Sequence, residues 1–262
     1  MDCIVTAGGL PGPEDSLYPY TQGKPKALLD MGERTMLERV MDALQTSNHV
    51  DRIVLVGLED DMGMNFKRPI DQYLPDHGSL VGNVLAGIEW LRQDEPNIES
   101  VLFCTSDLPA LTGANVDSFI ERCEPFDKGI YYIFVTRETM EARFPDSKRT
   151  YVKLKGVEIA GGDIAIAQAD LADTHEELWR ALTNARKHAW KLARVIGFRL
   201  LLKFLFRQLS INDIEETAAR IIDRPAEIVL DAPAEMAMDV DRPQQLELLR
   251  ADLQRKHDDA QQ

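Results

Sequence analysis

Short apolar runs alternate with segments of helical periodicity through the first half of the chain. Four runs have the length and composition of buried strands: Cys3–Ala7, Ile53–Val56, Val101–Cys104 and Ile130–Val135. Three segments between them repeat apolar residues at the spacing of amphipathic helices: Thr35–Leu44, Leu80–Leu91 and Val116–Ile120. This alternation predicts βαβ units, and therefore an α/β fold with a mainly parallel sheet flanked by helices.

The second half of the chain has a different pattern. Two strands are expected on either side of the turn Lys155-Gly156. A helical block runs from about Leu171 to Asp223, before a last strand at Ile228–Leu230 and a terminal helix that starts near Arg242. We expect a single domain over residues 1–262, with residues 171–223 as a helical insertion within it.

The charge balance excludes one large class of partners. The chain has 44 Asp and Glu against 30 Lys and Arg, a formal net charge of −14. A protein that binds duplex DNA through its phosphates needs an excess of basic residues, so no nucleic-acid partner is expected. Since 44% of the residues are hydrophobic, the chain is expected to form a packed core and not a disordered acidic segment.

The cysteines and the N-terminus indicate a cytoplasmic protein. Cys3, Cys104 and Cys123 are an odd number, are widely spaced and form no CxxC or zinc pattern. A disulfide framework is therefore not expected, and Cys3 and Cys104 are interpreted as core thiols. The first residues contain no basic region ahead of an apolar run, so no signal peptide is expected. No uncharged stretch reaches the ~18 apolar residues of a membrane-spanning helix.

Glycines follow the first predicted strand directly. In a parallel sheet, ligands bind outside the carboxyl ends of the strands. The segment Ala7-Gly8-Gly9 lies there, and its glycines would let the backbone approach a phosphate and direct N–H groups at it. An ordinary tight turn is the alternative, because the spacing matches neither GxxxxGK[ST] nor GxGxxG.

Two lysines and one aspartate add candidate chemistry near this edge. Lys24 and Lys26 flank Pro25, and an ammonium group suits a phosphoryl oxygen, although an isolated lysine pair is equally consistent with a solvated loop. Asp107 lies just past the end of the third strand, in Thr105-Ser106-Asp107. A carboxylate there suits Mg²⁺, which takes one or two protein carboxylates together with substrate phosphates; a turn cap before Pro109 is the alternative.

A second acidic pair occurs near the C-terminus. Asp239 and Asp241 are two residues apart within a short run that is expected to be extended. Only one of them, Asp241, is expected to face a site shared with Asp107, and Asp239 is expected to face away. Asp241 could equally cap the terminal helix, because Pro243 falls in the first turn.

These segments occur together in a recognisable order. Ala-Gly-Gly, Lys-Pro-Lys-Ala-Leu-Leu, Ser-Asp-Leu-Pro and Asp-Val-Asp-Arg-Pro follow one another along the chain. From Cys3 to about Leu249, this pattern resembles the MobA-like nucleotidyltransferases, within the wider superfamily of nucleotide-diphospho-sugar transferases. The resemblance implies a Rossmann-like sheet of the GT-A type. It also implies a reaction in which a phosphorylated acceptor attacks the α-phosphorus of an NTP, with Mg²⁺ bound and pyrophosphate released.

The resemblance also implies roles for individual residues. Lys26 and Asp107 are expected to be catalytic: Lys26 would stabilise charge on the α-phosphate, and Asp107 would hold Mg²⁺ with Asp241 as the second carboxylate. The expected nucleotide-binding residues are Ala7, Gly8, Gly9, Lys24, Lys26, Ser79 and Asn83. The expected acceptor-binding residues are Gly161 and Gly162.

The loop Leu10–Gln22 departs from the family pattern. That pattern usually contains an arginine that contacts the nucleotide phosphates, whereas this loop contains no arginine and two acids. Lys24 could replace it in part, but the bidentate geometry of arginine would be lost. Two alternatives therefore stay open: a sugar-phosphate nucleotidylyltransferase with a different acceptor, and a nucleotide-binding protein that has lost turnover.

The helical block is unusually basic. Between Leu178 and Asn212 it contains eight basic residues and no acid, so this segment carries +8 and the rest of the chain −22. Gly197 is expected to divide it, and in the second part Arg199, Lys203 and Arg207 form a basic stripe on a mostly apolar helix. Packing of Phe198–Leu209 onto its own domain or a dimer partner, contact with a membrane surface, and a lid over an anionic acceptor all remain open.

Overall fold

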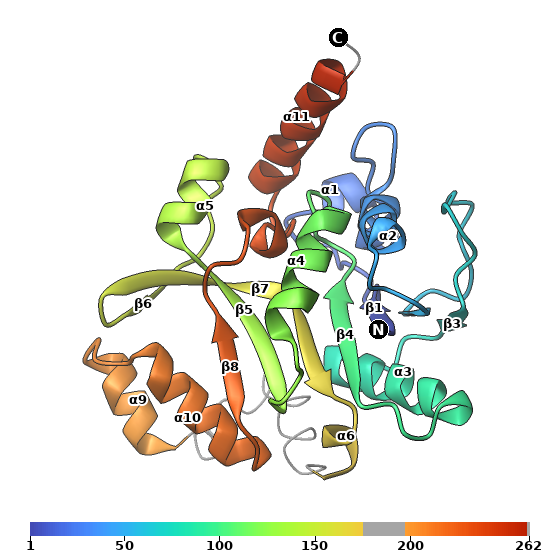
Figure 1. Cartoon of the computed structure of the whole chain (residues 1–262). Coiled ribbons are helices and arrows are strands. Elements are labelled where there is room, and N and C mark those ends of the chain that lie inside the picture. The colour runs from blue at the N-terminus through green and yellow to red at the C-terminus, as the bar shows by residue number, and fades with distance from the viewer. Residues whose placement is uncertain (175–196, 261–262) are drawn as a thin grey trace.

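The computed structural model describes residues 1–174 and 197–260. Its centre is an eight-stranded sheet in the order β3-β2-β1-β4-β7-β5-β8, with β6 paired to β7 outside this path (Figure 1). The strands on the first side of the sheet are β1 (Cys3–Thr6), β2 (Ile53–Val56), β3 (Gln72–Leu74) and β4 (Ser100–Thr105). All four run parallel to their neighbours here, as the βαβ pattern predicts.

The second side of the sheet contains antiparallel pairs. Its strands are β5 (Ile130–Thr136), β6 (Val152–Leu154), β7 (Val157–Gln168) and β8 (Ala226–Val229). The long strand β7 runs antiparallel to β4, β5 and β6, while β5 and β8 are parallel. The α/β prediction with a mainly parallel mixed sheet is confirmed, and β7 is the strand that makes the sheet mixed.

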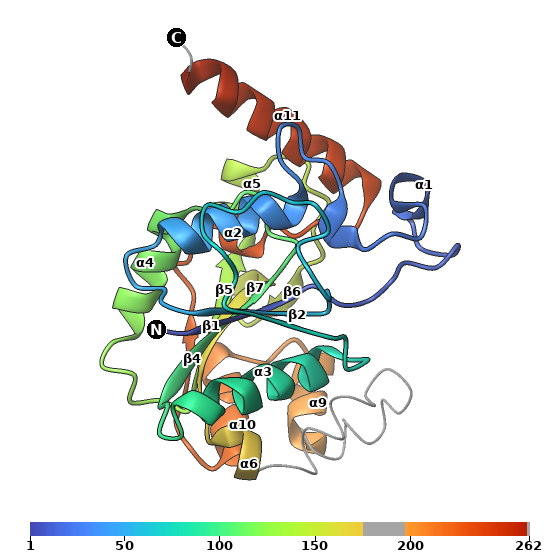
Figure 2. The same cartoon turned by 90° about the vertical axis from the view of Figure 1, so that its right-hand side faces the viewer.

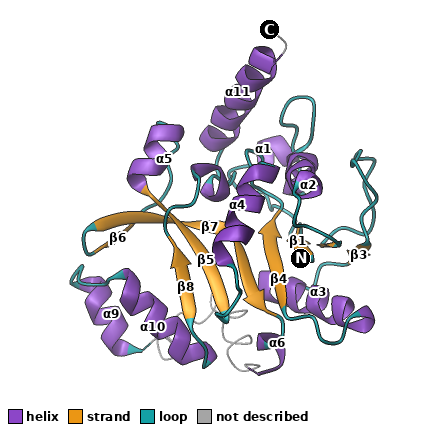
Figure 3. Cartoon of the chain, viewed as in Figure 1, coloured by secondary structure: helices purple, strands orange, loops and turns teal. Residues whose placement is uncertain are grey.

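Helices cover both faces of the sheet (Figure 2). The longer ones are α2 (Met36–Thr46), α3 (Leu80–Asp94), α4 (Gly113–Cys123), α10 (Ile211–Ile222) and α11 (Pro243–Ala260). In Figure 2, α2 and α4 lie above the sheet and α3 and α10 below it, and Figure 3 shows the C-terminal end of α11 projecting from the body. The short ones are α1 (Tyr18–Thr21), η1 (Lys26–Leu28), α5 (Arg137–Arg143), α6 (Leu171–Thr174), α9 (Phe198–Leu205) and η2 (Ala234–Ala237).

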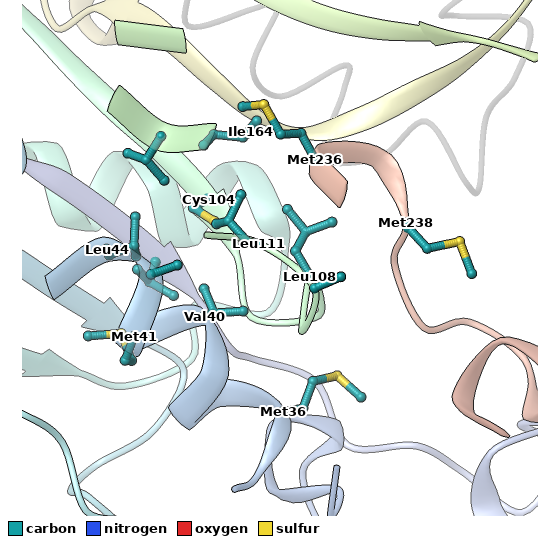
Figure 4. Packing of buried hydrophobic residues seen from close by; sticks show 14 of the residues in the cluster. Met36, Val40, Met41, Leu44, Cys104, Leu108, Leu111, Ile164, Met236 and Met238 are labelled. Carbon is teal, nitrogen blue, oxygen red and sulfur yellow. The ribbon is translucent and has the colours of Figure 1, made fainter. Parts of the chain in front are cut away.

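The main core lies between the sheet and the helices above it (Figure 4). Met36, Val40 and Leu44 follow one another at intervals of four residues, so α2 presents them all to the sheet, where they are fully buried. Cys104 of β4 belongs to the same cluster. Its thiol is buried and its pKa lies well above the ordinary value because of that burial, which agrees with its interpretation as an unreactive core thiol.

The helix predicted over Thr35–Leu44 is α2, and it begins at Met36 because Thr35 and Glu38 form a capping box at its N-terminus. The Thr35 hydroxyl accepts a hydrogen bond from the Glu38 backbone N–H, and the Glu38 carboxylate accepts one from the Thr35 N–H at 2.7 Å. This reciprocal pair satisfies two backbone donors that a helix leaves free at its first turn.

The block predicted to be a helical insertion is described in two parts. Helix α6 begins it, and α9 and α10 end it. Gly197 has a φ of 98° directly before α9, so the predicted break at this glycine agrees with the start of a helix at Phe198. Five of the eight basic residues of the block lie outside the described residues: Arg180, Arg186, Lys187, Lys191 and Arg194. No helix in the described ranges combines the length and apolar content needed to cross a bilayer.

Candidate active site

The strand order reverses between β1 and β4. Strand β1 leads to β2 on one side, whereas β4 continues the sheet on the other, so their carboxyl ends border the crevice where ligands bind in open α/β sheets. Ala7, Gly8 and Gly9 follow β1, and Asp107 follows β4. The pairing of Thr6 with Thr105 therefore makes the glycine segment after β1 and the segment of Asp107 neighbours, although they are far apart in sequence.

Gly8 after β1 and Gly57 after β2 are required by close packing. A Cβ atom on Gly8 would lie 2.5 Å from an Asp76 carboxylate oxygen and 2.7 Å from the Asn83 amide nitrogen. Gly57, which follows β2, has a φ of 113°, and a Cβ there would lie 2.2 Å from the backbone nitrogen of Gly8. Only glycine avoids both the steric clash and the backbone strain at position 57.

A hydrogen-bonded network fixes the far wall of the crevice. Asp76 accepts hydrogen bonds from the Gly9 N–H at 3.2 Å and from the Asn83 side-chain amide at 3.0 Å. The oxygen of the same amide accepts from the His77 N–H at 2.7 Å. Ser79 caps α3 by accepting from the Gly82 N–H. Asn83 is buried and both ends of its amide are engaged, so its observed contacts hold the loop in place.

Lys26 lies between two carboxylates from distant parts of the chain. Its ammonium nitrogen is 2.6 Å from Asp107 and 3.2 Å from Asp241. Burial opposes the charged form of Lys26, but the two carboxylates outweigh it and raise the lysine pKa above its ordinary value. Asp107 also accepts a hydrogen bond from the Thr105 hydroxyl at 2.5 Å. Lys26 is therefore a fixed positive charge at the end of the parallel strands.

The prediction that Asp239 faces away from Asp107 is wrong. Oxygen atoms of Asp107, Asp239 and Asp241 all lie within 4.8 Å of one another. In an extended run, residues two apart point to the same face, so strand alternation would place Asp239 and Asp241 together and does not support the prediction. Residues 238–241 form no strand in the structure, and their irregular backbone also brings both carboxylates to Asp107. The Val240 N–H donates to the Asp107 backbone carbonyl at 3.2 Å and holds the two acidic segments together.

Basic and acidic groups surround this cluster on its β7 side. Arg149 forms an ion pair with Asp239 and donates a hydrogen bond to the Gly161 carbonyl at 3.1 Å. Asp163 lies two residues beyond Gly161 on β7. Burial and the negative charge of Asp107 raise the pKa of Asp163 to about 7.

Two cavities meet at the acidic cluster. The larger, about 530 Å³, is lined by every residue predicted to bind the nucleotide or metal except Lys24: Ala7, Gly8, Gly9, Lys26, Ser79, Asn83, Asp107 and Asp241. The smaller, about 310 Å³, is lined by both predicted acceptor residues, Gly161 and Gly162. Both cavities share Asp163, Asp239 and Asp241. Lys24 is exposed and does not line the larger cavity, so its predicted contact with the nucleotide stays a prediction.

The glycine pair allows β7 to pass close to its neighbours. A Cβ on Gly162 would lie 2.3 Å from the Ile133 side chain, and one on Gly161 would lie 3.3 Å from the Tyr132 hydroxyl. That hydroxyl donates to the Gly162 carbonyl at 2.6 Å. The pair is therefore needed for packing against β5, and it leaves its backbone along the wall of the smaller cavity.

Sequence reasoning missed three side chains of the site. Asp163 carried a usable signal, because it follows directly on the glycine pair Gly161-Gly162. Asp76 also carried one, since it lies three residues before the cap of α3 at Ser79. Arg149 had none, because it lies in a loop between α5 and β6 and only the fold brings it to Asp239.

Comparisons with known proteins agree with this geometry. Residues 20–143 match the family model of the MobA-like NTP transferase domain. A solved structure described as a hypothetical transferase from Thermus thermophilus is 31% identical, with a TM-score of 0.78, over 94% of this chain and 98% of that chain.

More distant solved structures share the fold. CMP:2-keto-3-deoxy-manno-octonic acid synthetase, solved with CTP, is 12% identical with a TM-score of 0.59, over 98% of this chain and 100% of that one. The 4-diphosphocytidyl-2C-methyl-D-erythritol synthase of Anaerococcus prevotii is 14% identical with a TM-score of 0.57, over 97% and 95%. At these identities the likeness concerns the fold alone.

Proposed function

Since the chain belongs to the family of MobA-like NTP transferases, we propose that it is a Mg²⁺-dependent nucleotidyltransferase that moves an NMP from an NTP onto a phosphorylated acceptor and releases pyrophosphate. The single observation that carries this proposal is Lys26 held between Asp107 and Asp241 at the junction of the two cavities. A cation there faces the point where a nucleotide in the larger cavity would meet an acceptor in the smaller one.

The charges of the larger cavity support a metal requirement. Its lining residues include five carboxylates, from Asp76, Asp107, Asp163, Asp239 and Asp241, and one lysine, Lys26. A triphosphate would be repelled by this surface unless a cation lay between them. The oxygen donors of Asp107, Asp239 and Asp241 match the ligand chemistry of Mg²⁺. When bound, Mg²⁺ neutralises phosphate charge that develops during the transfer.

Different residues would bind the nucleotide, stabilise charge on the α-phosphate and position the acceptor. The backbone of Ala7–Gly9 would contact the nucleotide phosphates, with Ser79 and Asn83 holding the wall against the base. Lys26 would stabilise negative charge on the α-phosphoryl oxygens, which is an electrostatic role that needs no proton transfer. The Gly161-Gly162 backbone and Arg149 would position the acceptor in the smaller cavity.

The proposal is tested by pyrophosphate release from each of the four NTPs with a panel of phosphorylated acceptors. We expect release with at least one pair in the presence of Mg²⁺, and none after addition of EDTA. Asp107→Asn should abolish release while the protein stays folded, because it removes one charge from the carboxylate cluster. Asp94→Asn, at an exposed carboxylate at the end of α3, is the matched control and should leave the rate unchanged.

Three other outcomes would narrow or overturn the proposal. Release only with acceptors that are sugar phosphates would narrow it to a sugar-phosphate nucleotidylyltransferase. Tight NTP binding by calorimetry, without release for any pair, would show a nucleotide-binding protein that has lost turnover. NTP binding that is equally tight in EDTA and in Asp107→Asn would refute the metal assignment.

A further inference from the structure

Large apolar side chains are exposed together on one short helix. Among the described residues, eleven large hydrophobic side chains are exposed, and six of them fall within nine consecutive positions of α9 and the residue after it. We call these six the apolar patch: Phe198, Leu201, Leu202, Phe204, Leu205 and Phe206. Phe198 and Leu205 are 74% and 72% exposed, which is far more than isolated surface residues of a packed helix need.

The patch is exposed although the helix is firmly docked. Leu200 packs with Leu209, Leu154 and Ile159 in a small core beneath β6 and β7. Lys203 forms an ion pair with Asp213 of α10, and the Lys155 backbone N–H donates to the Leu209 carbonyl at 2.8 Å. Figure 1 shows α9 beside α10 at the edge of the molecule, below β6. One face of α9 is thus already packed against the rest of the protein. The apolar patch is a second face of the helix, and it is exposed to solvent.

Positive charge accompanies the patch. Arg207 follows the patch directly, and the backbone of Lys155 is hydrogen-bonded to Leu209, three residues beyond the patch. Both side chains are exposed, and neither has an ion pair within residues 1–174 and 197–260. The segment Leu178–Asn212, which contains α9, carries eight basic residues and no acid in a chain whose remainder carries −22. Positive charge is therefore concentrated on the same stretch of chain that exposes phenylalanine and leucine.

We propose that the apolar patch docks on the surface of an anionic lipid bilayer. Helices with Phe and Leu on one side and Lys and Arg beside them lie in the membrane interface, with the apolar side chains at the acyl boundary and the basic groups near the phosphates. A second copy of the chain fits less well. In a two-fold dimer the same patch meets itself, so that the positive charges of Lys155 and Arg207 from both copies would be gathered in one interface.

Vesicle flotation tests this proposal with the full-length protein. Vesicles of phosphatidylcholine alone are compared with vesicles that also contain phosphatidylglycerol, at low and at high salt. We expect the protein to float with the anionic vesicles at least about tenfold more than with the neutral ones, and less at high salt because the basic residues are then screened.

Substitutions in the patch test whether vesicle binding depends on the patch or on another part of the surface. The double variant Leu205→Glu, Phe206→Glu should lose flotation by about tenfold or more, while circular dichroism and pyrophosphate release stay unchanged. Met62→Glu is the matched control, since Met62 is 50% exposed on a loop after β2 and outside the patch, and it should float as the parent does.

Three results would overturn the proposal. The first is protein that stays in the soluble fraction with both vesicle types. The second is equal loss of flotation in Met62→Glu. The third is a dimer in sedimentation velocity that the double variant dissociates and that does not bind vesicles, which would make the patch a protein interface. None of these results depends on the proposed nucleotidyl transfer.

Discussion

Replacement of Asp163 by asparagine should stabilise the metal-free protein at neutral pH. Asp163 lies on β7 among the carboxylates of the site, and burial together with the charge of Asp107 raises its pKa to about 7. In the unfolded chain the same carboxyl has a pKa near 3.9. Between these two values the folded protein binds a proton that the unfolded chain has released, so ionisation of Asp163 disfavours folding.

The sign and size of the effect follow from this difference. The free energy of unfolding of the parent should fall as pH rises from about 4 to about 7 and should level off above that. A difference of about three pKa units corresponds to at most ~4 kcal/mol, since one unit is worth ~1.4 kcal/mol. Asp163→Asn keeps the shape of the side chain and removes the ionisation, so we expect it to gain about 1–4 kcal/mol at pH 8 and little at pH 4.

Urea unfolding in EDTA, at several pH values between 4 and 8, measures this gain. Added Mg²⁺ should reduce it, because a nearby divalent cation favours the ionised carboxylate. Asp117→Asn is the control of opposite sign: burial works against its ionised form, but hydrogen bonds from Ser47 and Asn48 lower the Asp117 pKa. Loss of the Asp117 carboxylate should lower the free energy of unfolding at neutral pH. If the unfolding free energies of Asp163→Asn and the parent run parallel from pH 4 to 8, the electrostatic reasoning is refuted.

Three further substitutions test other parts of the structure. Lys26→Ala should lower the rate of pyrophosphate release by about a hundredfold or more while the fold is kept, and a loss below tenfold would contradict its role at the α-phosphate. Gly57→Ala should cost about 2–4 kcal/mol of unfolding free energy, because its Cβ would clash with Gly8 at a φ of 113°, and unchanged urea unfolding would exclude that clash. Thr35→Ala should lower the melting temperature by about 2–4 °C through loss of the cap of α2, whereas Thr35→Ser should keep most of it.

Local patterns predicted those elements whose residues are buried in an unbroken run or at a regular period. Strand β2 was predicted at its observed bounds, Ile53–Val56, because its four residues are all buried. Strand β3 was missed, since its three residues are each half-buried and show no alternation. The prediction for Asp239, in the run before α11, is wrong for a different reason. Residues two apart in an extended run share a face, and in the irregular chain observed here Asp239 and Asp241 both reach Asp107.

The site residues found from the sequence are those that follow a parallel strand, and the fold explains why Asp163 was not among them. A parallel strand reaches the ligand-binding edge only at its carboxyl end, so Gly8 after β1 and Asp107 after β4 were accessible to that reasoning. Strand β7 runs the opposite way, and its pairing of Ile164 with Cys104 brings the residues just before Ile164 to the same edge. An antiparallel strand therefore contributes residues from within its length. Asp163 is surrounded there by strand residues, and the alternating pattern is the same whether a polar side chain meets water or a buried site, so the preceding glycine pair is its only sequence signal.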